Sequence, residues 1–255
     1  MKKVVFITGA SSGIGRACAY RFAADDCNII LSGRRADRLL ALAAELREKY
    51  SIAAFPLPMD VRHQADVESA IAGLPPAFSE PDILINNAGL ALGLSPLHEG
   101  SAEHWDTMID TNIKGVLYVS KALLPAMVKR GSGHVINIGS IAGREAYANG
   151  NVYCATKAAI DSLTKSLRME LLPYGIKVTQ IAPGAVETEF SEVRFLGDTD
   201  RAKSVYKGFE PLHEEDVANV VHFAASLPPH VNINDLLIMP TAQAAGGMIH
   251  RKSEN

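Results

Sequence analysis

Cysteine is scarce in this chain of 255 residues, and the spacings typical of metal sites are absent. The three cysteines are Cys18, Cys27 and Cys154. They form no Cys-x-x-Cys pair, and an odd number cannot make a fully paired disulfide framework. The eight histidines lack the paired spacing of a zinc site, and no His-Glu-x-x-His sequence occurs. We therefore expect no metal, no disulfides and a reducing, cytoplasmic environment.

Long apolar runs and a strong excess of one charge are also missing. The first apolar run, Val4–Ile7, is too short for a signal peptide, and no segment is long enough to cross a bilayer. A formal charge of -3 gives no electrostatic reason to bind nucleic acid or an anionic membrane. The hydrophobic content of 47% can form a sizeable core. The composition favours a globular protein with a small-molecule partner.

Short β-branched runs alternate along the chain with stretches of helical spacing. Most of these runs are apolar at successive positions, which is typical of strands buried on both faces of a parallel sheet. Alternating strands and helices predict right-handed βαβ crossovers. The expected fold is α/β, a Rossmann-type doubly wound parallel β-sheet with helices on both faces. Its strands are expected at Lys3–Thr8, Asn28–Ser32, Ala53–Met59, Ile83–Asn86, His134–Gly139, Lys177–Ile181 and Leu236–Met239.

No linker or repeat divides the chain, so residues 1–249 are expected to form one domain. The charged end, His250–Asn255, is expected to be a disordered tail. The segment Glu187–Gly208 is polar enough to be a mobile loop that covers a site. In a doubly wound sheet, ligands bind beyond the carboxyl ends of the strands. Functional residues are therefore expected directly after each strand.

A glycine-rich turn follows the first strand and opens a helix. Glycines let the backbone turn sharply and approach a pyrophosphate, and the helix N-terminus favours an anion. An ordinary βα turn is the alternative, but the position after the first strand favours phosphate binding. The residues are Thr8, Gly9, Ser11, Ser12, Gly13, Ile14 and Gly15.

Two arginines, Arg34 and Arg35, follow the second strand, where NAD-binding proteins carry a carboxylate. Guanidinium groups suit the 2′-phosphate of NADP through paired N–H donors. Solvated loop charges are the alternative. The sequence therefore predicts NADP as the cofactor.

Tyr153 is followed four residues later by Lys157, a spacing that none of the other tyrosines has. Side chains four apart on a helix share one face. A fixed ammonium there is expected to lower the phenol pKa and to suit Tyr153 to proton transfer. Ser140, after the strand that begins near His134, could hydrogen-bond the substrate oxygen. Asn112 offers an amide for a proton-relay water.

With these motifs, the chain resembles the short-chain dehydrogenase/reductase family over essentially its whole length. The resemblance implies an oxidoreductase with a catalytic tetrad of Asn112, Ser140, Tyr153 and Lys157. It also implies that Lys157 holds the nicotinamide ribose. Further family motifs would contact the adenine (Asp60, Val61), the length of the cofactor (Asn87, Ala88, Gly89) and the nicotinamide end (Pro183, Gly184, Val186, Thr188).

A closer similarity is to the subgroup that acts on small 3-hydroxy acids such as serine, L-allo-threonine and 3-hydroxypropionate. It is carried by Asn86–Gly93, Gly150–Tyr153, Glu189–Phe195 and Val231–Asn234. The expected reaction is hydride transfer between NADP and the 3-position of the acid, with Tyr153 as general acid/base. A carboxylate substrate needs a cation, and Arg194 is the first candidate, with Arg144 the second; a surface arginine is the alternative.

Three other functions stay open at this stage. The chain could reduce a 3-oxoacyl thioester or an apolar ketone, bind NADP without catalysis, or serve only as a scaffold. The polar segment Glu187–Asp200 argues against the first, the complete tetrad argues against the second, and titration with NADP would distinguish the third. By resemblance, the helices at Trp105–Met127 and Asn151–Leu171 are expected to build a homotetramer, aided by small residues such as Ala155 and Ala158.

Overall fold

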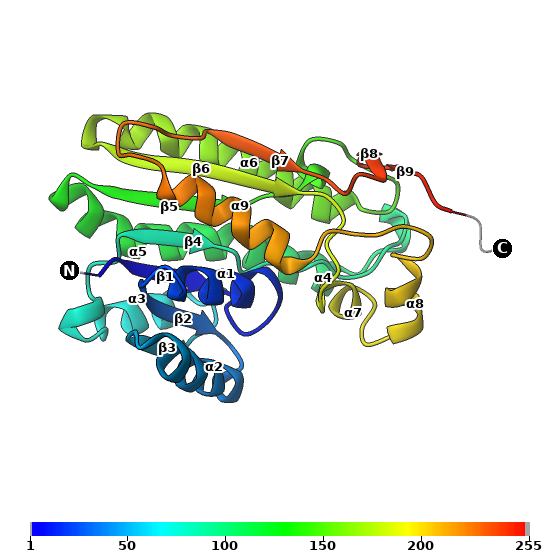
Figure 1. The fold of residues 1–255 in the computed structure, drawn as a ribbon. Coiled ribbons are helices and arrows are strands. Elements are labelled where there is room, and N and C mark those ends of the chain that lie inside the picture. The colour runs from blue at the N-terminus through cyan, green and yellow to red at the C-terminus, as the bar shows by residue number, and fades with distance from the viewer. Residues whose placement is uncertain (1, 253–255) are drawn as a thin grey trace.

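A seven-stranded parallel sheet forms the centre of the structure, a computed structural model that describes residues 2–252 (Figure 1). The strand order is β3-β2-β1-β4-β5-β6-β7, and every neighbouring pair is parallel. The predicted doubly wound fold is confirmed. Its strands are β1 (Val4–Thr8), β2 (Asn28–Gly33), β3 (Ala54–Pro58), β4 (Ile83–Asn86), β5 (Gly133–Ile138), β6 (Ile176–Pro183) and β7 (Asp235–Ile238).

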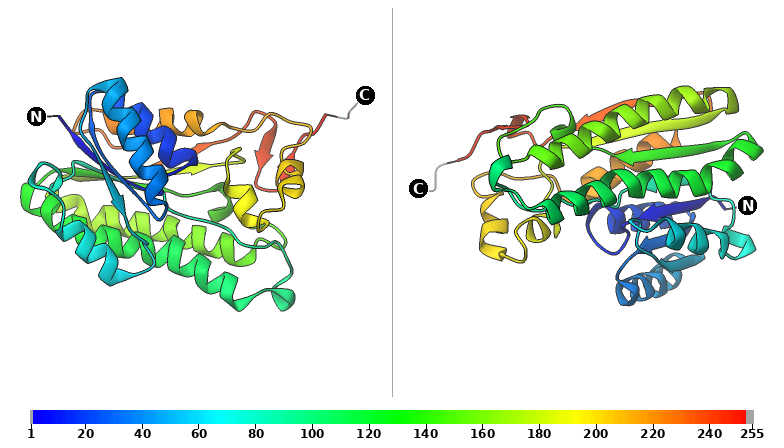
Figure 2. Two further views of the ribbon diagram at one scale, coloured as in Figure 1. Left: turned by 90° about the horizontal axis from the view of Figure 1, so that it is seen from below. Right: turned by 180° about the vertical axis from the view of Figure 1, so that it is seen from behind.

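Helices cover both faces of this sheet, which explains why the strands are apolar at successive positions. In β1, Val5 and Ile7 pack into the core on one face, whereas Val4 and Phe6 pack into the core on the other. Figure 2 shows α1, α2 and α9 on the first face and α3, α5 and α6 on the second. The longer helices are α1 (Gly13–Ala23), α2 (Ala36–Tyr50), α3 (Gln64–Ala72), α4 (Ala102–Ile109), α5 (Gly115–Arg130), α6 (Asn151–Leu171) and α9 (Glu214–Ser226).

The strand order reverses between β1 and β4, which makes this the switch point where an α/β sheet binds its ligand. Two short helices, α7 (Phe190–Arg194) and α8 (Thr199–Ser204), lie beyond the carboxyl ends of the strands at the right of Figure 1. They belong to the segment predicted as a polar, mobile loop, hereafter called the lid (residues 187–208). The fold therefore places the lid over the edge where a site is expected.

Three local features differ from the sequence-based expectation. A π-helical turn at Asp110–Lys114 joins α4 to α5. A small hairpin of β8 (Gln243–Ala245) and β9 (Met248–Ile249) follows the sheet. The interpretation of His250–Asn255 as a disordered tail is wrong for residues 250–252, because Lys252 N–H donates to Gly208 O at 2.7 Å and the Arg251 guanidinium donates to the Lys207 carbonyl. Residues 253–255 lie outside the described part of the chain.

His134 in β5 makes stability depend on pH. Its side chain is 3% exposed and shares a 2.8 Å hydrogen bond with Thr179, and burial, with Lys177 and Lys3 adding repulsion, lowers its pKa from 6.5 to about 3. Below pH 6.5 the unfolded chain binds a proton that the folded chain excludes, so stability falls as the pH drops toward 3. Relative to a His134→Gln variant, we expect the wild type to lose roughly 3 kcal/mol more between pH 7 and pH 4.

Urea unfolding of both proteins at several pH values measures this difference, because the other titrating groups are common to both. Parallel pH profiles would show that His134 does not titrate in this way.

Candidate active site

A cleft of about 560 Å³ opens at the carboxyl ends of β1, β4, β5 and β6, under the lid. Most of the predicted site residues line it, although they come from distant parts of the sequence. They are Gly9, Ser11, Ser12, Gly13, Ile14, Arg34, Arg35, Asp60, Val61, Asn87, Ala88, Gly89, Ser140, Tyr153, Lys157, Pro183, Gly184, Val186, Thr188 and Arg194. Thr8, Gly15 and Asn112 do not line the cleft and act from behind its wall.

The turn between β1 and α1 requires glycine. Gly9 and Gly13 have φ values of +66° and +54°, and a Cβ atom on Gly9 would lie 2.9 Å from Asn87 Nδ2. A Cβ atom on Gly15 would collide with the Gly9 carbonyl oxygen. The turn therefore leads the chain directly into the N-terminus of α1, where unpaired backbone N–H groups favour an anion.

Thr8 and Asn87 fasten this turn to the end of β4. The Thr8 hydroxyl accepts hydrogen bonds from the backbone N–H groups of Asn87 and Ala88, both at 2.9 Å. The Asn87 amide donates back to the carbonyl oxygens of Thr8 and Gly9 at 2.9 and 3.3 Å. Both loops therefore form one rigid wall of the cleft at the switch point.

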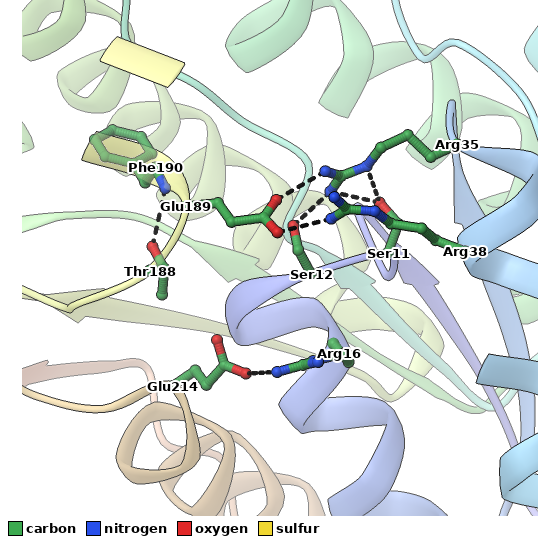
Figure 3. Close-up of polar contacts among 9 residues, drawn as sticks. All are labelled: Ser11, Ser12, Arg16, Arg35, Arg38, Thr188, Glu189, Phe190 and Glu214. Atoms are coloured by element: carbon green, nitrogen blue, oxygen red, sulfur yellow. Dashed lines mark hydrogen bonds and ion pairs between the residues drawn. The ribbon is translucent and has the colours of Figure 1, made fainter. Parts of the chain in front are cut away.

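An anion-binding position lies where the sequence predicted a phosphate contact, and Arg35 is at its centre (Figure 3). The Arg35 guanidinium donates to Ser11 Oγ at 3.1 and 2.9 Å and to Ser12 Oγ at 2.6 Å. Its Nη1 lies 2.7 Å from Glu189 Oε2, and Arg38 Nη1 lies 2.7 Å from Glu189 Oε1. Two guanidinium groups therefore converge on one carboxylate.

Two further predicted cofactor contacts, Arg34 and Asp60, lie beside this anion-binding position. The Arg34 side chain is exposed at the rim of the cleft. Asp60 pairs with Arg62 at 2.6 Å. Partial burial favours a raised Asp60 pKa, but the hydrogen bonds from Arg62 dominate and hold that pKa below its usual value. Asp60 therefore stays ionised, and its carboxylate is committed to Arg62.

Ser140, Tyr153 and Lys157 meet at the inner end of the cleft. Tyr153 and Lys157 lie on the first turns of α6, and Lys157 Nζ donates to the Ile138 carbonyl at 2.9 Å, which anchors the ammonium at the end of β5. Ser140 lies two residues after the end of β5, and its hydroxyl accepts a hydrogen bond from Ala142 N–H at 3.1 Å. All three residues are buried. The sequence prediction that they come together is therefore supported by their positions.

The pKa of Tyr153 is not lowered by Lys157 as the spacing predicted. Burial raises the Tyr153 pKa to about 12, and the charge of Arg194 and a hydrogen bond with Ser140 offset only part of that rise. Burial also lowers the Lys157 pKa to about 8. Desolvation outweighs the local charges here, so Tyr153 is a protonated phenol at neutral pH.

Asn112 has a structural role that its sequence position did not indicate. Its Oδ1 accepts from Leu90 N–H at 2.9 Å, and its amide N–H groups donate to Leu90 O at 2.9 Å and Thr156 Oγ1 at 3.0 Å. Both amide donors are used, so the prediction that this amide holds a relay water is wrong for its N–H groups. Asn112 instead ties the π-helical turn to α6 and to the loop after β4.

Arg194 of the lid reaches the catalytic residues through an aromatic cage. Its Cζ lies 4.9 Å from the ring centroid of Tyr153, 5.3 Å from that of Phe190 and 5.9 Å from that of Tyr147. Its Nη2 donates to the Tyr147 hydroxyl at 2.8 Å, whereas its buried Nε has no hydrogen-bond partner among the described residues. Within residues 2–252 no carboxylate pairs with this guanidinium. The cage therefore presents an uncompensated cation to the cleft.

Arg144, the second candidate for a carboxylate, points elsewhere. It forms an ion pair with Asp235 and does not line the cleft. Sequence reasoning gave no role to Arg38, Tyr147, Phe190 and Glu189, which the fold brings to the site, although Glu189 and Phe190 lie in the segment Glu189–Phe195 that carried the subgroup similarity. Arg38 also carried a usable signal, because it lies three residues after Arg35 at the start of a helix and so shares its face.

Neither a metal-binding cluster nor a membrane-spanning helix is found among residues 2–252. No three histidine, cysteine, aspartate or glutamate side chains gather there where they could hold a metal ion. No helix in that range combines the length and apolarity needed to cross a bilayer. Cys18, Cys27 and Cys154 are unpaired and buried.

Residues 3–197 match the short chain dehydrogenase family, and the chain belongs to that family. The predicted family and its oxidoreductase class are thereby confirmed.

The chain is 47% identical to an NADP-dependent 3-hydroxy acid dehydrogenase YdfG of Salmonella typhi over 97% of this chain and 99% of that protein. It is 45% identical to a sulfoacetaldehyde reductase 2 of Chromohalobacter salexigens over 96% of both chains. A solved structure of the closed form of serine dehydrogenase complexed with NADP+ superposes with a TM-score of 0.91 at 45% identity, covering 98% of this chain and 100% of that one. The predicted similarity to the 3-hydroxy acid subgroup is confirmed.

Proposed function

We propose that this protein is an NADP-dependent dehydrogenase of small 3-hydroxy acids, which it interconverts with the corresponding 3-oxo acids. The observation that carries the proposal is Arg194, a cation without a carboxylate partner among the described residues, held against the ring of Tyr153. A substrate carboxylate paired with Arg194 would lie beside the proton-transferring hydroxyl. That arrangement suits a short acid with its hydroxyl group two carbons from the carboxylate.

The cleft fits NADP at the pyrophosphate and at the adenosine end of the dinucleotide. The glycine turn between β1 and α1 packs so closely against the loop after β4 that a Cβ atom on Gly9 or Gly15 would collide with the chain itself, and the N-terminus of α1 that follows would face the pyrophosphate. At the adenosine end, Arg35 and Arg38 both pair with the carboxylate of Glu189, which supports an anion-binding role for these two arginines. Ser11 and Ser12 add hydroxyl groups beside it. These four side chains would hold the 2′-phosphate that distinguishes NADP from NAD.

The remaining cofactor contacts follow from the order of residues along the cleft. Asp60 and Val61 would lie near the adenine, and Asn87, Ala88 and Gly89 would lie along the middle of the cofactor. Lys157 would hold the nicotinamide ribose. The nicotinamide end would contact Pro183, Gly184, Val186 and Thr188, all of which line the cleft.

In the reaction, the chain itself positions the substrate and moves one proton. The bound nicotinamide supplies or accepts the hydride at carbon 3. In the direction of reduction, Tyr153 donates its phenolic proton to the forming alkoxide, a role that fits its high pKa. Ser140 would hold the same oxygen by a hydrogen bond. Asn112 keeps α6 and the loop after β4 in register, so that the reacting groups stay aligned.

Replacing Arg35 with serine is expected to weaken NADP+ binding about 30-fold, because charge-assisted hydrogen bonds to the phosphate are removed. NAD+ binding should change less than twofold, since NAD+ has no 2′-phosphate. Isothermal titration with both nucleotides measures the effect. Arg21→Ser is the control, because Arg21 lies on α1 and does not line the cleft. Equal losses for both nucleotides would contradict the assignment of Arg35.

Substrate class is tested in the direction of reduction. We expect kcat/KM for 3-oxopropanoate to exceed that for a small thioester of 3-oxobutanoate by at least about tenfold, because only the free acid can pair with Arg194. A sulfonate also pairs with guanidinium, so 2-oxoethanesulfonate belongs in the same assay. Preference for the thioester would overturn the proposal in favour of an acyl thioester reductase, and preference for the sulfonate would reassign the substrate acid.

We also propose a cytoplasmic homotetramer. Three unpaired buried thiols suit a reducing compartment. The helices expected at the subunit contacts expose large apolar side chains, including Leu117 on α5 at 44% and Met169 on α6 at 69%. Such side chains would be covered by neighbouring subunits.

A further inference from the structure

Glu189 fills the anion position between Arg35 and Arg38 (Figure 3). Each carboxylate oxygen accepts from one guanidinium, at 2.7 Å in both cases. Among residues 2–252, Glu189 is the only hydrogen-bond acceptor for Arg38 and the only carboxylate bound to Arg35. The strongest anion position of the cleft is thus occupied by a residue of the chain itself.

A 2′-phosphate would need the same N–H donors. Arg35 Nη1 and Arg38 Nη1 cannot direct their short hydrogen bonds at both a carboxylate and a phosphate, and two anions at this spacing repel each other. Glu189 is 41% exposed, so its carboxylate can return to water at small cost. A dianionic phosphate accepts more hydrogen bonds than a carboxylate and is the stronger partner for two guanidinium groups.

Glu189 also lies at the start of the lid, directly before α7. Five residues later the same segment carries Arg194, whose guanidinium lies against Tyr153. The short helix between them links the anion position to the catalytic end of the cleft. Movement of Glu189 therefore acts on the segment that holds the substrate-binding cation.

We propose that Glu189 is an internal competitor of the NADP 2′-phosphate, and that its displacement couples binding of NADP, but not of NAD, to the position of the lid. The inference goes beyond the proposed reaction and rests only on its choice of cofactor. NAD lacks the phosphate and leaves the ion pairs of Glu189 with Arg35 and Arg38 in place.

The first test is nucleotide titration of a Glu189→Gln variant. The glutamine keeps the size of the side chain but removes the charge that competes for the arginines. The two half-exposed ion pairs of Glu189 stabilise the nucleotide-free protein by an amount that corresponds to about a fivefold change in affinity. Their removal should therefore tighten binding of NADP+ and adenosine 2′,5′-bisphosphate about fivefold. Binding of NAD+ and 5′-AMP should stay within twofold of the wild type.

Glu192→Gln is the matched control, because Glu192 lies on the same lid segment, is exposed and does not line the cleft. Its titrations should match those of the wild type. Unchanged or weaker NADP+ binding by Glu189→Gln would overturn the proposal. Equal tightening of NADP+ and NAD+ would overturn it as well, because that pattern reflects general charge rather than competition at the phosphate.

Hydrogen exchange of the wild-type protein gives a second readout that needs no substitution. Backbone amides of residues 189–194 should change their exchange with saturating NADP+ and not with saturating NAD+. Identical exchange with both nucleotides would contradict the coupling. If the chain did not use NADP, the wild type would bind adenosine 2′,5′-bisphosphate no better than 5′-AMP; failure of the Glu189 proposal alone leaves that preference intact.

Discussion

A Tyr153→Phe variant is expected to turn over 3-hydroxy acids about 10³-fold more slowly than the wild type, because it keeps the ring but has no transferable proton. The ring packs against Phe190 at a centroid distance of 5.6 Å and beneath Arg194, an arrangement that phenylalanine preserves. The protein should therefore fold normally and bind NADP+ within a few-fold of the wild type. Steady-state kinetics and nucleotide titration together separate the effect on chemistry from any effect on binding.

The control for this variant is Tyr174→Phe, which removes a hydroxyl group from a tyrosine that is 45% exposed and outside the cleft. Its kcat should be unchanged. In the wild type, oxidation requires the Tyr153 phenolate, and since its pKa is about 12, the oxidation rate should still rise with pH above 9. A Tyr153→Phe variant with a kcat within tenfold of the wild type would show that another group moves the proton.

Replacing Arg194 with methionine is expected to raise KM for 3-hydroxy acids about 100-fold, which corresponds to roughly 3 kcal/mol for removing a charge-assisted hydrogen bond from a buried site. Methionine is chosen because it is unbranched and packs well against the aromatic rings of the cage. For a neutral substrate such as methyl 3-hydroxybutyrate, KM should change less than threefold. The comparison of acid and ester isolates the carboxylate from every other effect of the substitution.

Arg201→Met provides the control, because Arg201 also lies on the lid over an aromatic ring, 4.5 Å from the centroid of Phe195, but does not line the cleft. Arg194→Lys should recover part of the acid preference. Arg194 lowers the pKa of Tyr153. Its removal should therefore also shift the increase in the rate of ester oxidation with pH to higher pH values. Equal increases in KM for acid and ester would exclude Arg194 as the carboxylate partner.

The main elements of the fold were predictable because strands that are buried on both faces are apolar at successive positions of the sequence. All seven strands of the sheet were expected, and Ile83–Asn86 was expected at its observed bounds. The strands β8 and β9 have three and two residues, too few for any periodicity. The π-helical turn at Asp110–Lys114 depends on the hydrogen bonds of Asn112 with Leu90 and Thr156, which no local pattern encodes.

At the site, residues that directly follow strands were predictable, and those that arrive by tertiary contact were not. Arg35 belongs to the first group, and Tyr153 was predictable from its spacing to Lys157. Glu189 and Tyr147 belong to the second, because 154 residues separate Glu189 from Arg35 and 47 separate Tyr147 from Arg194. The high pKa of Tyr153 was also missed, since the spacing to Lys157 reveals a nearby charge but not the depth of burial.

The central claim is that the cleft oxidises a hydroxyl group placed by a carboxylate on Arg194, with NADP+ as the acceptor. The most direct test compares kcat/KM of the wild type for 3-hydroxybutyrate and for its methyl ester, each with NADP+ and with NAD+, by the absorbance of the reduced nucleotide. The acid should exceed the ester by about 100-fold with NADP+, and NADP+ should exceed NAD+ by at least about tenfold. An ester oxidised as efficiently as the acid, or an enzyme that prefers NAD+, would contradict this account.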